Sequence, residues 1–299
     1  MNGGLEYAQQ DWYPVAMVGE LVNGQSRQTR LLGTELNLHC DDNGTVSVVS
    51  TGRNLQVQQA FDHLWTTLSE QPRDLFVISE AQEDGRRLVP CGVVRVKCSP
   101  LRAVENFLDI AHFPFVHTGV LGAEPHTEVY KYDVRIDDTD DEVIASNIRF
   151  YQPQASKSSA GGIETEYIYR VPAPMAAVLY KTCPPKPESM DVIALFVQPL
   201  DEETCDVWPW MALYDDTSSM ADLIQFQQLI FLQDRSILEN QIPRKLPLDP
   251  KMEIPTRADL TSVAYRRWLK RHSAWYGAQI STDLSSGSVD EFVTDGLAG

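Results

Sequence analysis

The chain has 299 residues, of which 43% are hydrophobic and 22% are charged, so it can bury a sizeable core in one large domain or in one domain with a small appendage. Its formal net charge of −17 makes nucleic acid a poor partner, because binding to phosphates requires clustered Lys and Arg side chains. Such acidity is usually a solvated surface, and it also suits docking to a basic patch on a partner.

The cysteines and the N-terminus indicate the compartment. Five scattered cysteines, an odd number, give no disulfide framework and fit a reducing cytoplasm. The first residues show no basic region followed by an apolar run, and no apolar stretch is long enough to cross a membrane. We therefore expect a cytoplasmic protein that has no membrane partner.

Residues 12–68 are expected to form the short strands of a small β unit. Asn43-Gly44 is a strong signal for a hairpin turn, with alternating apolar residues on both sides. Residues 86–96 are again strand-like. A helix is predicted to begin at Ser99, because Ser is a favoured N-cap and the Pro that follows it is tolerated at the first helical position.

Two histidines and a carboxylate stand close together in the mostly apolar segment that follows. On the predicted helix, Asn106, Asp109 and His112 are spaced i, i+3 and i+6 and share one broad face. Pro114 disfavours helical geometry at the residue before it and removes a backbone donor, so the helix should bend or end near His112. The chain can then bring His117 back toward the same point. Two converging imidazoles suit a first-row transition metal.

The third ligand of such a site is expected on a second helix, at residues 219–240. Asp234 lies there among apolar positions. Two His and one carboxylate with open positions form the facial triad of non-haem Fe(II) oxygenases. A single His on an apolar helix is usually a satisfied core residue. Two at this spacing, with Asp109 placed to orient one of them, favour a metal site at His112, His117 and Asp234.

From residue 127 onward the apolar pattern changes to a period of two, which marks half-exposed strands. Antiparallel strands with short links, followed by two helices, predict an α+β protein with a curved sheet wrapped around a long helix. The end of the chain is small, polar and acidic and is predicted to be a flexible tail. The strands are expected at residues 130–136, 143–151, 163–171, 177–182, 192–199 and 207–214, the helices at 219–240 and 257–271, and the tail at 281–299.

The spacing Asn106-x-x-Asp109-x-x-His112-x-x-x-x-His117, followed much later by Asp234, resembles the catalytic domain of the Rieske-type non-haem iron oxygenases. The resemblance implies mononuclear Fe(II) on the two histidines and Asp234, with O2 as co-substrate. It also implies that Asp109 connects this iron to a Rieske histidine on a neighbouring chain. Asn106 lies on the helix face that can line a substrate pocket, and a purely structural hydrogen bond fits it equally well.

Further segments extend the resemblance over residues 11–271 and imply the helix-grip (START-like) fold. Residues 1–70 are then the β remnant of a Rieske domain, residues 71–280 the catalytic domain with its iron, and residues 281–299 the acidic tail. The similar segments lie at residues 11–16, 30–35, 61–65 and 264–269.

One departure from the family concerns the Rieske cluster, which requires Cys-x-His and Cys-x-x-His to hold its two irons. None of the five cysteines in this chain has a His two or three residues downstream. We therefore expect an oxygenase subunit without a cluster of its own. Its electrons would come in trans from a Rieske-bearing reductase, which carries flavin and 2Fe-2S centres and oxidises NADH.

A cluster-less subunit of this kind is similar to a component of the bacterial methylxanthine N-demethylases of caffeine degradation. The sequence of residues 105–117 is also similar to these enzymes. This resemblance implies monooxygenation of 7-methylxanthine to xanthine and formaldehyde. It also implies a homologous or glutathione-S-transferase-like structural subunit and a trimer-based oligomer.

Two alternatives remain open at this point. The chain fits another Rieske-less oxygenase, such as an O-demethylase or a ring hydroxylase, because nothing in the sequence selects the substrate. The helix-grip fold also serves non-catalytic carriers of small molecules and structural subunits, although retention of all three ligands argues against that role. The other histidines, which we expect at the surface or in packing, are His39, His63, His126 and His272.

Overall fold

The computed structural model describes residues 3–154, 161–249 and 252–280. Its largest element is an eight-stranded antiparallel sheet in the order β10-β11-β12-β13-β14-β15-β8, with β9 also paired to β15. This arrangement confirms the α+β class predicted from the sequence. The strands of this sheet are β8 (Arg87–Pro90), β9 (Val94–Val96), β10 (Asp133–Ile136), β11 (Val143–Gln152), β12 (Ile163–Ala173), β13 (Ala176–Thr182), β14 (Met190–Pro199) and β15 (Cys205–Leu213).

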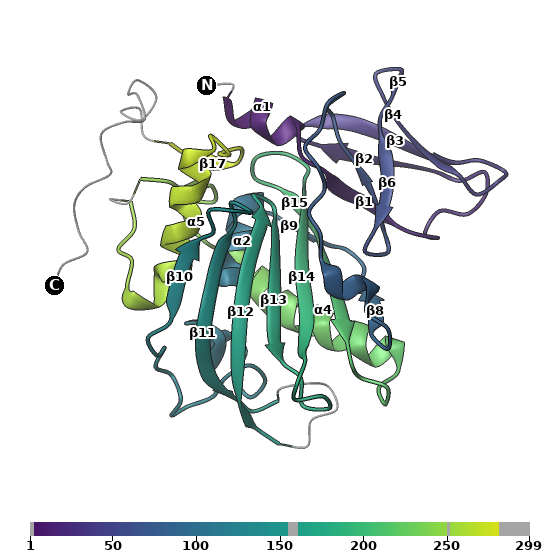
Figure 1. Ribbon diagram of the computed structural model, residues 1–299. Coiled ribbons are helices and arrows are strands. Elements are labelled where there is room, and N and C mark those ends of the chain that lie inside the picture. The colour runs from purple at the N-terminus through teal and green to yellow at the C-terminus, as the bar shows by residue number, and fades with distance from the viewer. Residues whose placement is uncertain (1–2, 155–160, 250–251, 281–299) are drawn as a thin grey trace.

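Helices cover one face of this sheet, and the long helix α4 lies behind it in Figure 1. The Ser219 side chain accepts a hydrogen bond from the backbone N–H of Asp222 and caps the start of α4, as expected for a favoured N-cap. Helix α5 lies beside β10 and β11 at the edge of the sheet. The helices are α1 (Gly3–Gln9), α2 (Pro100–Leu108), α3 (Phe113–Val116), α4 (Met220–Leu238) and α5 (Leu260–Arg271), with 3-10 turns η1 (Ser79–Gln82) and η2 (Arg257–Asp259).

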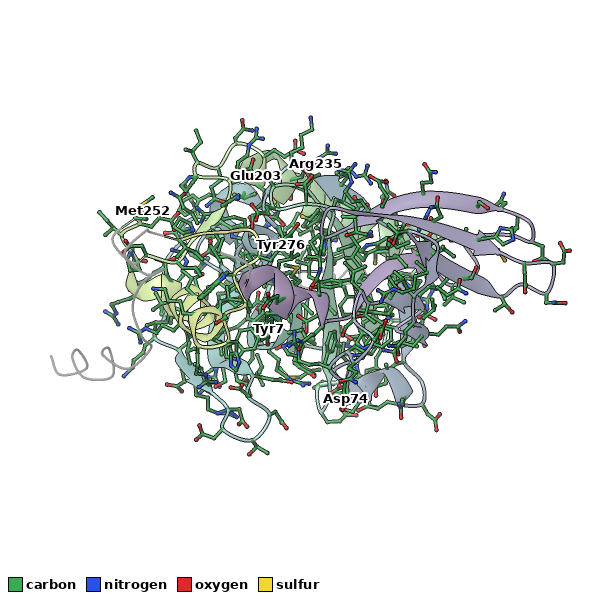
Figure 2. The ribbon with its side chains drawn as sticks, turned by 90° about the horizontal axis from the view of Figure 1, so that it is seen from above. Tyr7, Asp74, Glu203, Arg235, Met252 and Tyr276 are labelled. Carbon is green, nitrogen blue, oxygen red and sulfur yellow. The ribbon has the colours of Figure 1, made fainter. Side chains whose placement is uncertain are left out.

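The N-terminal part consists of two small antiparallel sheets, which extend beyond the rest of the molecule in the view from above (Figure 2). The hairpin predicted at Asn43-Gly44 is present between β3 and β4, and Gly44 adopts the positive φ of 81° that this turn requires. One sheet contains β1 (Tyr13–Met17), β6 (Val57–Ala60) and β7 (His63–Thr66), the other β2 (Ser26–Leu31), β3 (Thr34–Cys40), β4 (Val46–Ser50) and β5 (Arg53–Asn54), and a separate parallel pair is β16 (Leu246–Pro247) with β17 (Ala278–Gln279).

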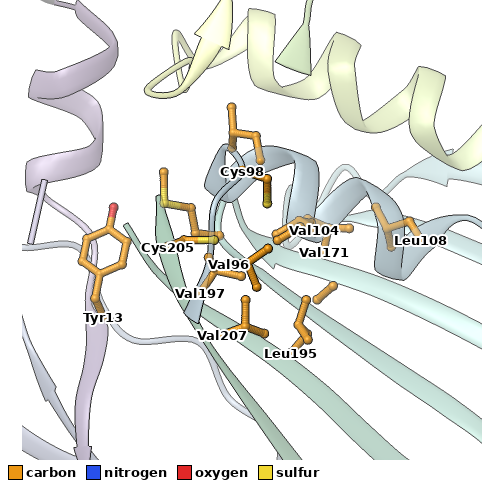
Figure 3. Close-up of a cluster of buried hydrophobic side chains, with 14 of the residues drawn as sticks. Tyr13, Val96, Cys98, Val104, Leu108, Val171, Leu195, Val197, Cys205 and Val207 are labelled. Carbon is orange, nitrogen blue, oxygen red and sulfur yellow. The ribbon is translucent and has the colours of Figure 1, made fainter. Parts of the chain in front are cut away.

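The main hydrophobic core joins the N-terminal sheets to the large sheet. Figure 3 shows Tyr13 of β1 on the side of Cys205 of β15, with Cys98, Val96 and Val207 farther into the same cluster, and all five side chains are buried. The five cysteines of the chain are buried free thiols.

Several predicted boundaries differ from the structure. The strand expected at residues 86–96 is divided into β8 and β9, because Gly92 lies in a positive-φ conformation between them. The strand expected at residues 130–136 begins only at Asp133. Helix α1 was not predicted. Residues 281–299, predicted as a tail, lie outside the described residues. Among the described helices, none combines the length and apolarity needed to cross a bilayer.

Candidate metal centre

The segment that leads to the first histidine folds differently from the prediction, in which one helix continues from Ser99 to about His112. Helix α2 ends at Leu108, and Asp109 is extended, with φ −81° and ψ 122°. One carboxylate oxygen of Asp109 accepts the backbone N–H of Ala111 at 2.8 Å, which turns the chain sharply. Pro114 then lies in the first turn of the new short helix α3, where its missing N–H costs no hydrogen bond. The prediction that His112 shares the helix of Asp109 is therefore wrong.

The turn nevertheless brings the predicted ligands together. Nε2 of His112 lies 3.1 Å from Nε2 of His117. Oδ1 of Asp234 lies 3.2 Å from the first of these atoms and 2.9 Å from the second. The side chains of His117 and Asp234 are buried, and that of His112 is nearly so. Within residues 3–154, 161–249 and 252–280, this is the only group of three or more His, Cys, Asp or Glu side chains close enough to share a metal ion.

The outer contacts determine which ring nitrogens face inward. Oδ2 of Asp109 accepts a hydrogen bond from Nδ1 of His112 at 3.0 Å. Oε1 of Gln233 accepts one from Nδ1 of His117 at 2.8 Å. Because carboxylate and amide oxygens only accept, each histidine is protonated at Nδ1. Both Nε2 lone pairs therefore point at Asp234, which is the arrangement that orients histidines for a metal.

Three electron-rich atoms that converge in a buried site repel one another unless a cation or a proton lies between them. In the absence of a metal, burial lowers the pKa of His112, but its contacts with Asp109 and Asp234 outweigh burial and raise that pKa to about 9. Two ligand atoms at right angles, each about 2.1 Å from a metal, are about 3.0 Å apart, which agrees with the three separations observed. The nitrogen–nitrogen–oxygen donor set and its geometry thus fit a first-row divalent ion with open positions.

A pocket extends from the metal centre between α4 and the large sheet. Asn106, predicted to line a substrate pocket, lies in its wall, as do His112, His117 and Asp234. Asp109 is outside the lining, with a side chain that is 30% exposed, so it faces away from the pocket. The apolar part of the lining includes Phe107, Phe113, Leu179, Ile193, Met211 and Phe231.

Several polar residues of the site were missed by sequence reasoning. Gln233 holds His117, and its position next to Asp234 is the only sequence signal that indicates it. Gln227 lines the pocket from α4 and is buried, two turns before Asp234. Lys181 and Asp191 line the pocket from two strands, and their pairing cannot be inferred without the strand register.

The remaining histidines lie away from this centre. His63 is fully buried, where its ring packs edge-on against Phe196 and Trp208. His39 and His126 are exposed, and His272 contacts Trp268. These positions match the expected roles in packing and at the surface.

Comparison with known proteins gives consistent matches. The family model described as the vanillate O-demethylase oxygenase C-terminal domain matches residues 96–274. The chain is 46% identical over 279 residues to the probable methylxanthine N7-demethylase NdmC of Pseudomonas sp. (strain TJI-51), covering 93% of this chain and 99% of that protein. It is 28% identical over 177 residues to the methylxanthine N1-demethylase NdmA of Pseudomonas putida, covering 56% of this chain and 46% of that protein.

Two solved structures share the fold. The structure of NdmA from Pseudomonas putida with caffeine superimposes with a TM-score of 0.72 at 19% identity, covering 94% of this chain and 99% of that chain. Dicamba monooxygenase bound to dicamba superimposes with a TM-score of 0.70 at 16% identity, covering 89% of this chain and 97% of that chain. At these identities the likeness concerns the fold alone.

Proposed function

This chain belongs to the Rieske-type non-haem iron oxygenases, in the family of the vanillate O-demethylase oxygenase C-terminal domain, and we propose that it is the oxygenase component that removes the N7-methyl group of a methylxanthine. The observation that carries the proposal is the buried facial arrangement of His112, His117 and Asp234 at one end of a largely apolar pocket. The substrate is inferred from 46% identity over 99% of a probable methylxanthine N7-demethylase.

The proposed reaction is a monooxygenation of the methyl carbon. One oxygen atom of O2 enters the C–H bond and the other leaves as water, with two electrons and two protons from outside. The product is an N-hydroxymethyl group, whose C–N bond breaks to give formaldehyde as the proton returns to the ring nitrogen. For 7-methylxanthine the final products are xanthine and formaldehyde.

The residues of this chain would hold and orient the reactants. His112, His117 and Asp234 would bind Fe(II), which supplies the activation of O2 when bound. Asp109 and Gln233 keep the two imidazoles in the tautomer that presents Nε2 to the metal. The apolar pocket wall excludes water from the reacting methyl group. Asn106 lies where it can contact the ligand.

Electron delivery is proposed to occur in trans. None of the five cysteines stands in a Cys-x-His or Cys-x-x-His motif, which supports a subunit without its own Rieske cluster. A Rieske-bearing reductase with flavin and 2Fe-2S centres, reduced by NADH, would then dock where Asp109 reaches the surface. We extend the proposal to a cytoplasmic, trimer-based assembly with a homologous or glutathione-S-transferase-like subunit.

The domain limits follow from the same proposal. Residues 1–70 would be the cluster-less remnant of the Rieske domain, and residues 71–280 the catalytic domain. The strands before residue 70 form sheets separate from the large sheet, which supports this division.

The test is turnover of 7-methylxanthine by anaerobically purified, iron-loaded protein, with formaldehyde and xanthine measured. Formaldehyde should form only when NADH and a Rieske-bearing reductase are present. The purified chain should contain one iron and no acid-labile sulfide. The visible spectrum of a Rieske cluster in the chain alone would refute the proposal that electrons arrive from another protein. Absence of turnover with an active reductase would refute 7-methylxanthine as the substrate.

An O-methyl aromatic acid is the second candidate substrate, because the matching family model is described as a vanillate O-demethylase domain. Both reactions release formaldehyde, so the two substrates must be supplied separately. Preferential turnover of vanillate would make O-demethylation the activity in place of N-demethylation. The proposed metal centre would be the same for both activities.

A further inference from the structure

The pocket is elongated, and the metal centre lies near one of its ends. The lining residues of α4 follow one face of the helix from Leu223 to Asp234. These two residues are eleven positions apart, which corresponds to roughly 16 Å along the helix axis at about 1.5 Å of rise per residue. Asp234 belongs to the metal centre, so Leu223 marks the opposite end of the pocket.

This opposite end coincides with one edge of the large sheet. Leu223 packs in one cluster with Leu213, the last residue of β15. Because β14 is antiparallel to both of its neighbours, its start lies between the ends of β13 and β15. Three charged lining residues occupy this edge, namely Lys181 near the end of β13, Asp191 near the start of β14 and Asp215 just after β15. The pocket therefore changes from an apolar wall to polar groups at this edge.

The pocket reaches the protein surface at the same edge. All of its lining residues lie in the described part of the chain, and among them only Pro185 is exposed, whereas the others are buried or half-buried. Pro185 is in the loop that joins β13 to β14. The mouth of the pocket is thus at Pro185, Leu213 and Leu223, far from the metal centre.

Asp109 lies on the other side of the metal centre. Nδ1 of His112 donates to Oδ2 of Asp109 at 3.0 Å, whereas Nε2 of the same ring faces His117 and Asp234. The two ring nitrogens point away from each other, so the His112 ring separates Asp109 from the metal centre. The Asp109 side chain is partly exposed and does not line the pocket. The metal centre is therefore reached from two different sides of the protein.

We propose that the substrate enters and the products leave through the mouth at Pro185, Leu213 and Leu223, while electrons arrive on the Asp109 side. This inference rests on the proposed function, in which a separate reductase supplies the electrons. Because the two sides face away from each other, a reductase docked at Asp109 leaves the mouth open. It stays bound while 7-methylxanthine enters and while xanthine and formaldehyde leave, so product release does not require the reductase to dissociate.

Leu223→Trp tests the entry side. A larger side chain in the mouth hinders passage in both directions, but it lies too far from the metal to contact a ligand bound there. The association and dissociation rate constants of 7-methylxanthine should each fall by about 10-fold, and Kd should change by less than about 2-fold. Surface plasmon resonance on the iron-loaded protein, without air, measures both rate constants. Leu232→Trp is the matched control, because Leu232 is exposed on the same helix and does not line the pocket.

The second measurement uses the wild-type protein alone. The two rate constants are determined with and without a saturating amount of oxidised reductase, which docks but delivers no electrons. They should agree within about 2-fold, because the docked reductase does not cover the mouth. An association rate constant lowered by about 10-fold in the complex would show that docking covers the mouth and would overturn the inference.

The outcomes separate this inference from the function on which it rests. If the protein neither binds nor demethylates 7-methylxanthine, the proposed function fails, and vanillate, the second candidate substrate, is taken through the same two comparisons. If it does both, unchanged rate constants in well-folded Leu223→Trp would overturn the entry side alone. Weaker binding with an unchanged association rate constant would also overturn it, because Leu223 would then contact the bound ligand. The comparison with reductase decides the matter even if Leu223→Trp does not fold.

Discussion

His117 and Gln233 are joined by a hydrogen bond of 2.8 Å, in which Nδ1 of the imidazole donates to Oε1 of the amide. The residue immediately before Asp234, the proposed carboxylate ligand, thus orients a proposed histidine ligand that lies more than a hundred positions earlier in the chain. One turn of α4 controls both the carboxylate and the orientation of an imidazole.

Gln233→Leu should weaken iron binding without unfolding the protein. The substitution removes the acceptor that fixes the His117 tautomer, and loss of such a contact typically costs about 10–100-fold in metal affinity or activity. Gln233→Glu restores an acceptor and should recover most of the affinity. Titration of the metal-free proteins with metal measures the affinities of both Gln233 variants. The exposed Leu229→Ala on the same helix is the control. Equal affinities for Gln233→Leu and wild type would remove Gln233 from the site.

Replacement of any metal ligand should abolish iron binding while the fold persists. His112→Ala, His117→Ala and Asp234→Ala each delete one of three donors, and the remaining core contacts are unaffected. Iron content per chain and circular dichroism melting curves give the two readouts. A variant that retained full iron and full turnover would show that its residue is not a ligand.

Asp109→Asn should separate electron delivery from metal binding. The amide can still accept one hydrogen bond from His112, so we expect most of the iron to remain, but the charge on the exposed side of the site is lost. NADH-driven turnover with the reductase should fall severely, and peroxide, which brings both oxygen and electrons, should restore part of the product. Equal losses in the two assays would assign Asp109 to the metal site alone.

Acid should destabilise the protein through His63. Burial lowers the pKa of His63 from 6.5 to about 4, so between these values the unfolded chain binds a proton that the native chain excludes. The free energy of unfolding therefore falls as pH decreases, by about 1.4 kcal/mol per pH unit from this group. Urea denaturation at pH 7 and pH 5 should show a shallower dependence for His63→Gln. The exposed, non-titrating Leu229→Ala should keep the wild-type dependence, and an unchanged slope in His63→Gln would contradict the assignment.

The convergence of His112, His117 and Asp234 was predictable from sequence, but the path of the chain between the two histidines was not. Pro114 was expected to end a helix, because proline excludes helical geometry from the residue before it. In the structure Asp109 ends the helix earlier by accepting the Ala111 N–H, and Pro114 starts a new one. Asp side chains favour turns and also tolerate helices, and only tertiary packing decides between these outcomes at Asp109.

The fold class could be predicted from the periodicity of apolar residues. The residues that line the pocket could not be predicted without the register of the strands. Alternating apolar residues located most strands of the large sheet, and the helix expected at residues 219–240 corresponds to α4. Lys181 and Asp191 each resemble an exposed charge in a strand end when taken alone. They become a pair facing the pocket only because β13 and β14 form a hairpin in this register, which the intervening loop sequence does not specify.

The aromatic contacts of the N-terminal sheets make them indispensable to the part of the molecule that binds metal. Phe61 and Trp65 pack against Phe196 on β14, and Phe61 also packs against Trp210 on β15. Each such ring buries about 150–250 Å². A chain trimmed at its N-terminus to the metal-binding portion would leave these rings of the large sheet in water and would tend to aggregate. The small sheets therefore cover aromatic side chains of the large sheet. We expect their removal to lower the solubility of the remaining chain even where the proposed metal site is retained.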